Sequence, residues 1–262
     1  MKQRVISAII ALAIVIPLLF LGGIYFKILA YALGVLSLRE LIRARKRIPK
    51  YMEYISYLLF TVIFVNNFYL IGTTFYLDFK LLILMLIVLI LPLVIYHDNE
   101  LYNIDDALYL IGSVLFMSLA YIVVVNLRDE NLLIIFYIMI ITIITDTFAF
   151  IGGCKYGKHK LVPSISPKKS VEGLIFGTLS GTIAGSLFYI FLMGGLNIYL
   201  VISFTLFLSL VGQFGDLIFS SIKRHYDIKD FSNIMPGHGG ILDRLDSIIF
   251  VMLAYIYIIE LL

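Results

Sequence analysis

Long apolar runs separated by short polar breaks fill most of the 262-residue chain. A transmembrane helix needs about 20 predominantly apolar residues, and the runs between charged or glycine-rich breaks give about nine candidates of that kind. They lie near residues 5–21, 24–39, 54–72, 78–96, 107–126, 132–152, 172–194, 197–219 and 243–261. The pattern therefore predicts an all-α, polytopic integral membrane protein with about nine transmembrane helices.

The composition agrees with a membrane protein and narrows the classes of function. Hydrophobic residues make up 61% of the chain and charged residues 14%. Soluble domains have about 45–50% apolar and about 25% charged residues. The formal net charge of +3 is too small to favour a nucleic acid as partner. The single cysteine, Cys154, excludes an internal disulfide and a metal site built from several cysteines.

The placement of Lys and Arg predicts the orientation of the spans. The basic N-terminus precedes an apolar run that resembles a signal peptide, but no small-residue cleavage site follows, so we expect an uncleaved first span. Further basic clusters lie at 39–50, 155–169 and 223–229. With the spans counted as above, all these clusters fall on one side, which should be the cytosol. The acidic loop at 97–106 falls on the same side, but acidic residues count little in this rule.

This topology brings the chemically capable side chains to the cytosolic face of the cell membrane. Asp146, Asp216, Asp243 and Asp246 all lie at the cytosolic ends of predicted spans. We therefore expect N-terminal spans, middle spans and a catalytic C-terminal region with cytosolic loops. The expected boundaries are 1–75, 76–141 and 142–262.

The acids are the first candidates for chemistry. Asp146 and Asp216 lie well inside apolar runs, where an acid costs about 2.5–3.5 kcal/mol and usually faces a cavity, a metal or a partner. The alternative is an acid that reaches the interface or pairs with a lysine. Asp243 and Asp246 are three residues apart, so they share a helix face. Carboxylates of this kind suit Mg²⁺, although N-terminal capping of a helix would explain one of them equally well.

A glycine-rich turn and two lysines are the next candidates. Residues 236–240 read PGHGG, and glycines let a backbone approach an anion closely, although such a cluster also forms simple turns. His238 in this turn is open to two interpretations, a phosphate donor or a structural residue. Lys168 and Lys169 precede a span, as cytosolic anchors do, but they would also attract a triphosphate or a lipid phosphate.

One segment carries a specific resemblance. Residues 220–246 read SSIKRHYDIKDFSNIMPGHGGILDRLD. This segment resembles the signature of the phosphatidate cytidylyltransferase family, which has K-R, then K-D, then H-G-G-x-x-D-R-x-D. The stretches DTFAFIGG with GKHKL, and ISPKKSVEG, resemble the family as well. Phe148, Val171 and Met235 depart from the family pattern, where Gly, Trp and another apolar residue are usual.

The resemblance implies an activity and a set of partners. The family joins CTP to phosphatidic acid and releases pyrophosphate, leaving CDP-diacylglycerol among the membrane lipids. Because the lipid phosphate is already anionic, the reaction needs suppressed charge repulsion and in-line orientation more than a strong base. Implied cofactors are Mg²⁺ and a possible second cation such as K⁺, and the implied assembly is a homodimer.

The resemblance also implies roles for particular residues. The implied metal ligands are Asp216, Asp243 and Asp246. The implied catalytic residues are these three with Lys223, Arg224 and His238. The implied substrate-binding residues are Asp146, Lys168, Lys169, Lys229, Asp230, Gly239, Gly240 and Arg244.

Three other functions remain open from the sequence. A CTP-dependent kinase of lipid alcohols such as polyprenols would transfer the γ-phosphoryl group and release CDP. A phosphatidyltransferase acting on CDP-alcohols fits less well, because its spaced D-G…A-R…G…D…D pattern is not found. A transporter would also hold acids in its spans, but it would more often have two related halves with broken helices.

Overall fold

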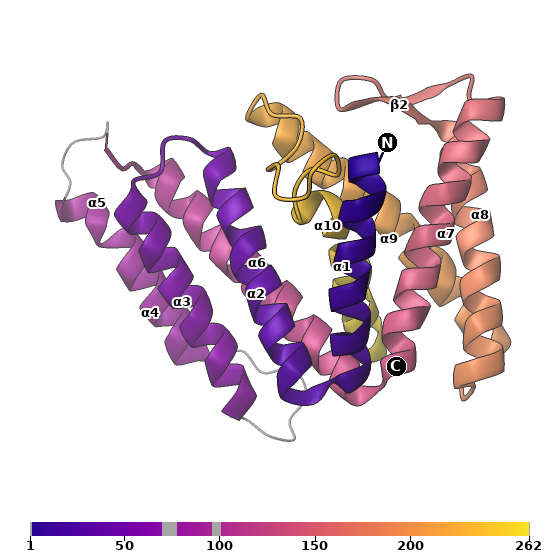
Figure 1. The fold of residues 1–262 in the computed structure, drawn as a ribbon, viewed down its shortest axis with the longest axis horizontal. Helices are drawn as coiled ribbons and strands as arrows, with labels where there is room; N and C mark the ends of the chain where they lie inside the picture. Colours follow the sequence, from indigo (N-terminus) through magenta and orange to yellow (C-terminus); the bar gives the residue numbers. More distant parts are fainter. Residues whose placement is uncertain (1, 70–77, 96–100, 262) are drawn as a thin grey trace. The chain divides into compact units, whose positions relative to one another are not determined.

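The computed structural model describes residues 2–69, 78–95 and 101–261. Within these residues the regular secondary structure is helical except for one short hairpin, so the predicted all-α membrane fold is confirmed. The described residues form two compact units, one from 1–129 with 230–243 and one from 130–229 with 244–262 (Figure 1). The three-part division expected from the motifs stays a prediction.

The helices follow the predicted apolar segments closely. The elements are α1 (Lys2–Leu21), α2 (Gly23–Ala44), α3 (Lys50–Tyr69), α4 (Phe79–Ile90), α5 (Pro92–Ile95), α6 (Ile104–Glu130), α7 (Leu132–Tyr156), β1 (Lys160–Val162), β2 (Ser166–Ser170), α8 (Val171–Phe188), the π-helical turn η1 (Tyr189–Met193), α9 (Ile198–His225) and α10 (Leu242–Ile259). The break between α4 and α5 comes before Pro92, because proline cannot donate a helical hydrogen bond.

The count of about nine spans is not confirmed. Within the described residues, four helical segments are long and apolar enough to cross a membrane: Ile104–Glu130, Leu132–Tyr156, Val171–Met193 and Ile198–His225. Shorter apolar helices cover Ile6–Leu21 and Phe79–Ile95. The predicted span ends at 70–72 and at 96, and residues 97–100 of the acidic loop, lie outside the described residues.

In the first unit, α2 packs against α1 and α3. The connection between α1 and α2 turns at Gly22, whose φ of 65° is in the left-handed region that glycine adopts most easily. Arg128, near the end of α6, donates from Nε to the Leu19 carbonyl at 3.0 Å and from Nη2 to the Phe20 carbonyl at 3.0 Å. Because the last carbonyls of a helix lack helical partners, this arginine stabilises the end of α1.

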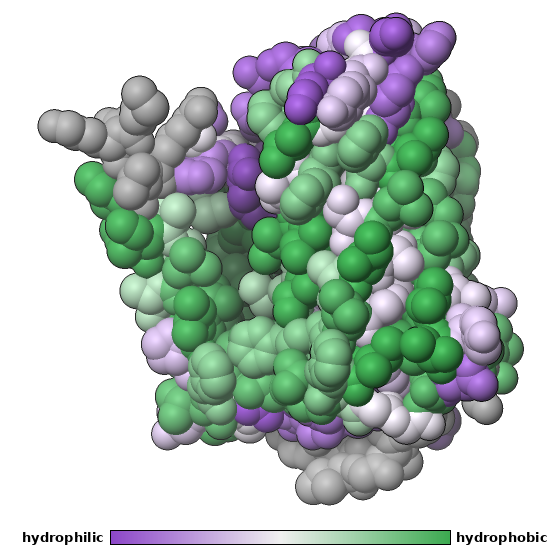
Figure 2. Space-filling model, turned by 90° about the vertical axis from the view of Figure 1, so that its right-hand side faces the viewer, coloured by the Kyte–Doolittle hydropathy of each residue, from purple (hydrophilic) through white to green (hydrophobic). Residues whose placement is uncertain are grey.

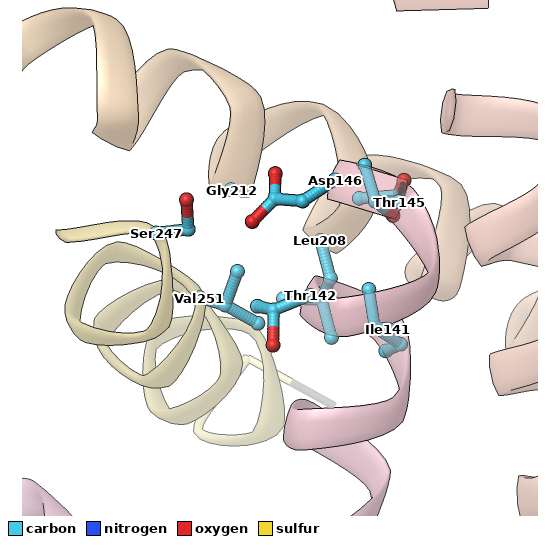
Figure 3. Close-up of a pocket in the computed structure, with 9 residues that line it drawn as sticks. Ile141, Thr142, Thr145, Asp146, Leu208, Gly212, Ser247 and Val251 are labelled. Carbon is cyan, nitrogen blue, oxygen red and sulfur yellow. Dashed lines mark hydrogen bonds between the residues drawn. The ribbon is translucent and has the colours of Figure 1, made fainter. Parts of the chain in front are cut away.

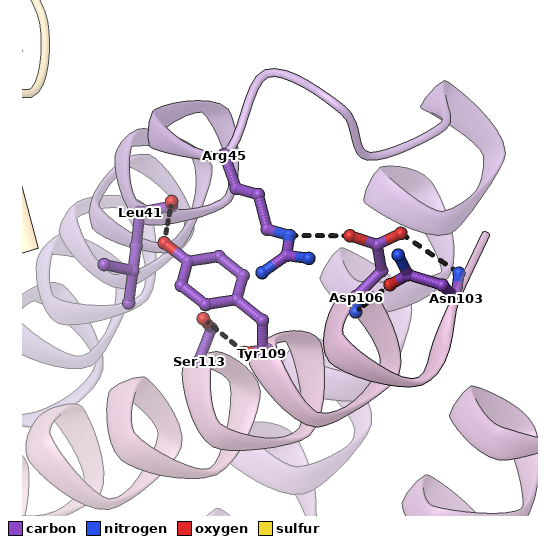
Figure 4. A network of polar contacts seen from close by, with 6 residues as sticks. All are labelled: Leu41, Arg45, Asn103, Asp106, Tyr109 and Ser113. Atoms are coloured by element: carbon purple, nitrogen blue, oxygen red, sulfur yellow. Dashed lines mark hydrogen bonds and ion pairs between the residues drawn. The ribbon is translucent and has the colours of Figure 1, made fainter. Parts of the chain in front are cut away.

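A polar network joins the end of α2 to the start of α6 (Figure 4). Arg45 donates from Nε to Oδ1 of the buried Asp106 at 2.6 Å. Asp106 and Asn103 cap α6 reciprocally, each side chain accepting from the other's backbone N–H. The Tyr109 hydroxyl donates to the Leu41 carbonyl at 2.6 Å. These contacts fix the last turns of α2.

In the second unit, α8 packs closely along α7 and also contacts α9. Small residues permit the close approach. A Cβ atom at Gly177 would lie 2.6 Å from the Thr145 carbonyl oxygen, and one at Gly181 would lie 2.0 Å from Thr145 Oγ1. The residues between α7 and α8 form the antiparallel β1–β2 hairpin, which the sequence analysis did not predict.

The surface on the side of α7 and α8 is largely apolar. In Figure 2, hydrophobic residues cover the middle of this face and hydrophilic residues gather toward its upper end. Exposed side chains on these helices include Phe150, Phe176 and Ile183. In water such a surface would be costly, whereas lipid covers it without cost, so this face agrees with a membrane protein.

Candidate functional site

Three helices of the second unit bring three carboxylates together. Asp146 lies on α7, Asp216 on α9 and Asp246 on α10. Asp146 interacts electrostatically with Asp216, and Asp246 interacts with both of the others. We call Asp146, Asp216 and Asp246 the acid cluster. Since like charges repel, a group of this kind requires nearby cations.

Two lysines of the same unit face the acid cluster. Lys169 Nζ lies 2.6 Å from Asp216 Oδ2, and the two side chains are 28% and 30% exposed. Lys223, only 8% exposed, interacts with Asp246. Lys169 and Lys223 thus supply positive charge at the acid cluster, which lessens the repulsion between its carboxylates.

The secondary structure explains why these side chains meet. Asp216, Ser220 and Lys223 are four and three residues apart on α9, so they lie along one face of the helix. The Ser220 hydroxyl donates to Asp216 Oδ1 at 3.2 Å. Successive residues of a strand point to opposite sides, so β2 turns Lys169 toward Asp216 while its neighbour Lys168 is exposed.

A small pocket lies beside Asp146 (Figure 3). Its other lining residues come from α7, α9 and α10 and are Ile141, Thr142, Thr145, Leu208, Ser209, Gly212, Ser247 and Val251. Ser247 is 4% exposed and interacts with Asp146, yet its hydroxyl reaches no hydrogen-bond geometry with a described residue. In Figure 3, Asp146 and Ser247 lie on opposite sides of the pocket, and Val251 and Thr142 lie next to each other below them.

The glycine-rich turn belongs to the first unit, where it is tightly folded. Gly237 and Gly239 have φ values of 78° and 84°, which glycine adopts without strain. Asp243 Oδ2 accepts from the backbone N–H of Phe231 and of Gly240, each at 2.9 Å. Asp243 therefore organises the turn that precedes α10. Whether it also joins Asp216 at a metal ion stays a prediction, since the two residues belong to different units.

His238 is held by the N-terminal helix. Its Nδ1 lies 2.9 Å from the hydroxyl of Ser7 on α1, and the same hydroxyl lies 3.2 Å from the Pro236 carbonyl oxygen. A hydrogen bond at one ring nitrogen fixes the orientation of the imidazole. His238 is therefore a positioned side chain in the turn, and its contact with a phosphate stays a prediction.

Glu40, on α2, is a residue that the sequence analysis missed. Its side chain is 2% exposed and accepts hydrogen bonds from the backbone N–H groups of Ile241 and Leu242, both at 2.9 Å. It lies within a basic cluster at the end of an apolar run, where a single acid resembles a surface residue. Its burial follows from contacts about 200 residues away, which no local pattern predicts.

The remaining predicted residues are mostly exposed. Arg224 donates from Nη1 to the Ile228 carbonyl at 3.1 Å and from Nε to the Ile165 carbonyl at 3.4 Å, so it ties α9 to the turn between the strands. Asp230 lies beside Gly239, where its Oδ1 would be 3.4 Å from an added Cβ. Lys168, Lys229 and Arg244 are exposed.

The donor set fits a hard divalent cation better than any other metal. Mg²⁺ takes oxygen ligands, usually one or two carboxylates, and fills its other positions with water and substrate phosphates. The acid cluster supplies carboxylates of this kind. Within the described residues, however, no group of three or more His, Cys, Asp or Glu side chains is arranged so that it could hold a metal ion, so the metal site stays a prediction.

Replacing Lys169 by methionine should lower turnover about tenfold or more, whereas Lys168→Met should have little effect. Lys169 faces Asp216 at 2.6 Å, while the adjacent Lys168 is exposed. Both substitutions remove one positive charge from the same strand, so they form a matched pair. Initial rates of the purified variants would measure the difference. Equal losses of activity in the two variants would mean that the positive charge of β2 matters and that the position of Lys169 beside Asp216 does not.

Comparison with known proteins gives an independent result. The model of the cytidylyltransferase family matches residues 2–262. The chain is 35% identical over 261 residues to a phosphatidate cytidylyltransferase of Staphylococcus haemolyticus, with 96% of each chain covered. It is 34% identical over 256 residues to the phosphatidate cytidylyltransferase of Bacillus subtilis, covering 96% of this chain and 95% of that protein.

Proposed function

The chain belongs to the cytidylyltransferase family, and from that premise we propose that it transfers CMP from CTP to phosphatidic acid, giving CDP-diacylglycerol and pyrophosphate. The observation that supports this most strongly is the acid cluster with its two lysines in a helical membrane protein. Relatives named phosphatidate cytidylyltransferase match nearly the whole chain, at 96% coverage, which favours the same pair of substrates.

The chemistry requires two anionic substrates to approach each other. The attacking group is an oxygen of the lipid phosphate, and the bond that breaks joins the α-phosphorus of CTP to the bridging oxygen of pyrophosphate. No strong general base is needed, because the nucleophile is already deprotonated. The protein's task is to orient the two phosphates in line and to screen their repulsion.

The residues of this chain divide into two groups for that task. Lys169 and Lys223 lie at the acid cluster. When substrate binds, each ammonium group would leave its carboxylate partner and bind a substrate phosphate. Asp216 and Asp246 would hold Mg²⁺, which when bound supplies charge neutralisation at the triphosphate. In the first unit, His238, Gly239 and the backbone around Asp243 would form the wall of a phosphate site.

The proposal includes the location and the assembly. The active site would face the cytosol at the cytoplasmic membrane, because CTP is soluble and phosphatidic acid stays among the membrane lipids. The basic clusters would lie on that same side. We propose a homodimer, with a second cation such as K⁺ accompanying Mg²⁺.

Labelled nucleotide tests the function directly. Purified protein in mixed micelles with phosphatidic acid should move label from CTP carrying a labelled α-phosphate into chloroform-soluble lipid. Label from γ-phosphate-labelled CTP should appear in pyrophosphate and never in lipid. Lipid labelling from the γ-phosphate, with CDP as the other product, would instead identify a lipid kinase. Labelling from neither nucleotide would refute the transfer of CMP to phosphatidic acid.

A further inference from the structure

Glu40 is a buried carboxylate, and both of its oxygens accept hydrogen bonds from residues 232–242. Its side chain lies in α2 and is 2% exposed. Oε1 accepts from the Ser232 hydroxyl and from the Ile241 backbone N–H at 2.9 Å, and Oε2 accepts from the Leu242 backbone N–H at 2.9 Å. Burying a charged group is costly unless hydrogen bonds compensate it, and this carboxylate has three such donors from a segment far along the chain.

The segment that Glu40 holds is the start of α10, where a capping side chain is missing. The first N–H groups of a helix have no helical partner and are usually capped by a side chain just before the helix. Ile241 stands at that place, directly after Gly240, and neither residue has a side-chain acceptor. A Cβ atom at Gly240 would lie 2.6 Å from both Glu40 carboxylate oxygens. The Glu40 carboxylate thus fills the position of the missing cap.

Asp243 completes the cap from within the helix. Its Oδ2 accepts from the Gly240 N–H at 2.9 Å, three residues back, as the acid of a capping box does. The two carboxylates therefore satisfy the N–H groups of Gly240, Ile241 and Leu242 between them. One consequence is geometric: Glu40 and Asp243 together determine the conformation of the turn that contains His238 and Gly239.

The helix that presents Glu40 is itself fixed. The Leu41 carbonyl, on the next residue, accepts from Tyr109 at 2.6 Å, and Arg45 pairs with Asp106 at 2.6 Å (Figure 4). Both contacts anchor α2 to α6 within the same turns of helix. Glu40 is therefore held rigidly, as a residue that positions another segment must be.

We infer that Glu40 is a positioning residue for the proposed transfer of CMP: it holds residues 235–242 in the conformation that presents His238 and Gly239 to substrate phosphate. The inference rests on the proposed function and adds a residue of the N-terminal helices to the reaction. Glu40 itself does not contact the reacting atoms. Its role is to replace the side-chain cap that Ile241 cannot supply, while Gly240 leaves room for the Glu40 carboxylate beside the turn.

Glu40→Gln tests the inference with a small change in size. The amide oxygen can still accept from Ser232 and Ile241, but the amide nitrogen would face the Leu242 N–H, so two donors would oppose each other. We expect kcat to fall about 30-fold or more and the KM for at least one phosphate substrate to rise about threefold or more. Hydrogen–deuterium exchange should accelerate at the amides of residues 239–243 and remain unchanged in α3.

Glu53→Gln is the matched control. Glu53 is another partly buried acid of the first unit, 13% exposed, which pairs with Arg43 at 2.9 Å and accepts from the Tyr57 hydroxyl within α3. We expect it to keep wild-type kinetics. If part of the sample is merely unfolded, the apparent kcat would fall in proportion to the unfolded fraction, and the KM would keep its wild-type value. Wild-type kcat and KM in folded Glu40→Gln protein would overturn the inference, as would the same changes in Glu53→Gln.

Ser232→Ala decides the question if Glu40→Gln fails to fold. It removes one of the three donors to Glu40 from a partly exposed position in the turn. We expect a raised KM and faster amide exchange at 239–243 in the folded variant. Wild-type values for both would overturn the inference. Absence of CMP transfer in the wild-type protein would instead refute the proposed function. Wild-type kinetics in the Glu40 variant would refute only the role of Glu40 and leave that function intact.

Discussion

Replacing Asp216 by asparagine should reduce CMP transfer about 100- to 1,000-fold while leaving the protein folded and inserted in the membrane. Asparagine keeps the shape of the side chain and removes its charge. Asp216 pairs with Lys169 at 2.6 Å and interacts with both other members of the acid cluster. Its charge therefore acts on Lys169, Asp146 and Asp246 at once. The initial rate of label transfer from CTP to lipid, per folded protein, measures the effect.

Asp129→Asn is a close control for that experiment. Asp129 pairs with Lys27 at 3.2 Å, and the two side chains are 37% and 26% exposed, much as at the pair of Asp216 and Lys169. Exposed ion pairs contribute about 0–1 kcal/mol to stability, so neither variant should unfold. We expect near-normal activity from Asp129→Asn. Comparable activity in Asp216→Asn would remove Asp216 from the catalytic machinery.

Much of the fold could be predicted because hydropathy is a strong signal in a membrane protein. Each apolar run overlaps a helix of the described residues, since a segment in lipid must satisfy its backbone groups internally. The number of spans was harder to predict from hydropathy than the positions of the helices. The segment at 78–96 contains Pro92, which separates α4 from α5, and α2 and α10 carry charges that weaken them as spans.

The candidate site was predicted in its residue types and only partly in its arrangement. Asp146, Asp216 and Asp246 were all expected, and they cluster because helices α7, α9 and α10 pack in one unit. The hairpin that presents Lys169 was not predicted, because its strands are short and β2 contains Pro167, a residue that disfavours strands. Glu40 was missed because its partners are separated from it by up to 202 residues.

One signal in the sequence could have pointed to Glu40. Gly239 and Gly240 precede α10 without a Ser, Thr, Asn or Asp in the usual capping position. A helix start that lacks a cap and lies inside the protein needs an acceptor from elsewhere. An acid near the end of an apolar run can supply that acceptor, so this signal could have made Glu40 a candidate for the missing cap. The sequence alone does not identify which acid supplies the acceptor, because that depends on tertiary packing.

Removal of divalent cations should abolish turnover, and Mg²⁺ should restore it. The proposed ligands Asp216 and Asp246 belong to the acid cluster, and Mg²⁺ is usually held by one or two such carboxylates together with substrate phosphates. Activity after dialysis against a chelator, followed by titration with Mg²⁺, measures the requirement. Full activity in the presence of the chelator would exclude the proposed role of Asp216 and Asp246 as ligands.

The competition between Lys169 and the metal gives a sharper form of this prediction. Lys169 already neutralises Asp216 at 2.6 Å, so a metal ion bound at Asp216 must displace it or share the carboxylate. Lys169→Met should therefore tighten the binding of Mn²⁺, measured by electron paramagnetic resonance without substrate, even though it lowers turnover. Asp216→Asn should weaken the same binding. If Lys169→Met and Asp216→Asn change Mn²⁺ binding in the same direction, the metal does not bind at Asp216, because a site there would gain affinity when the competing ammonium group is lost and lose affinity when the carboxylate is lost.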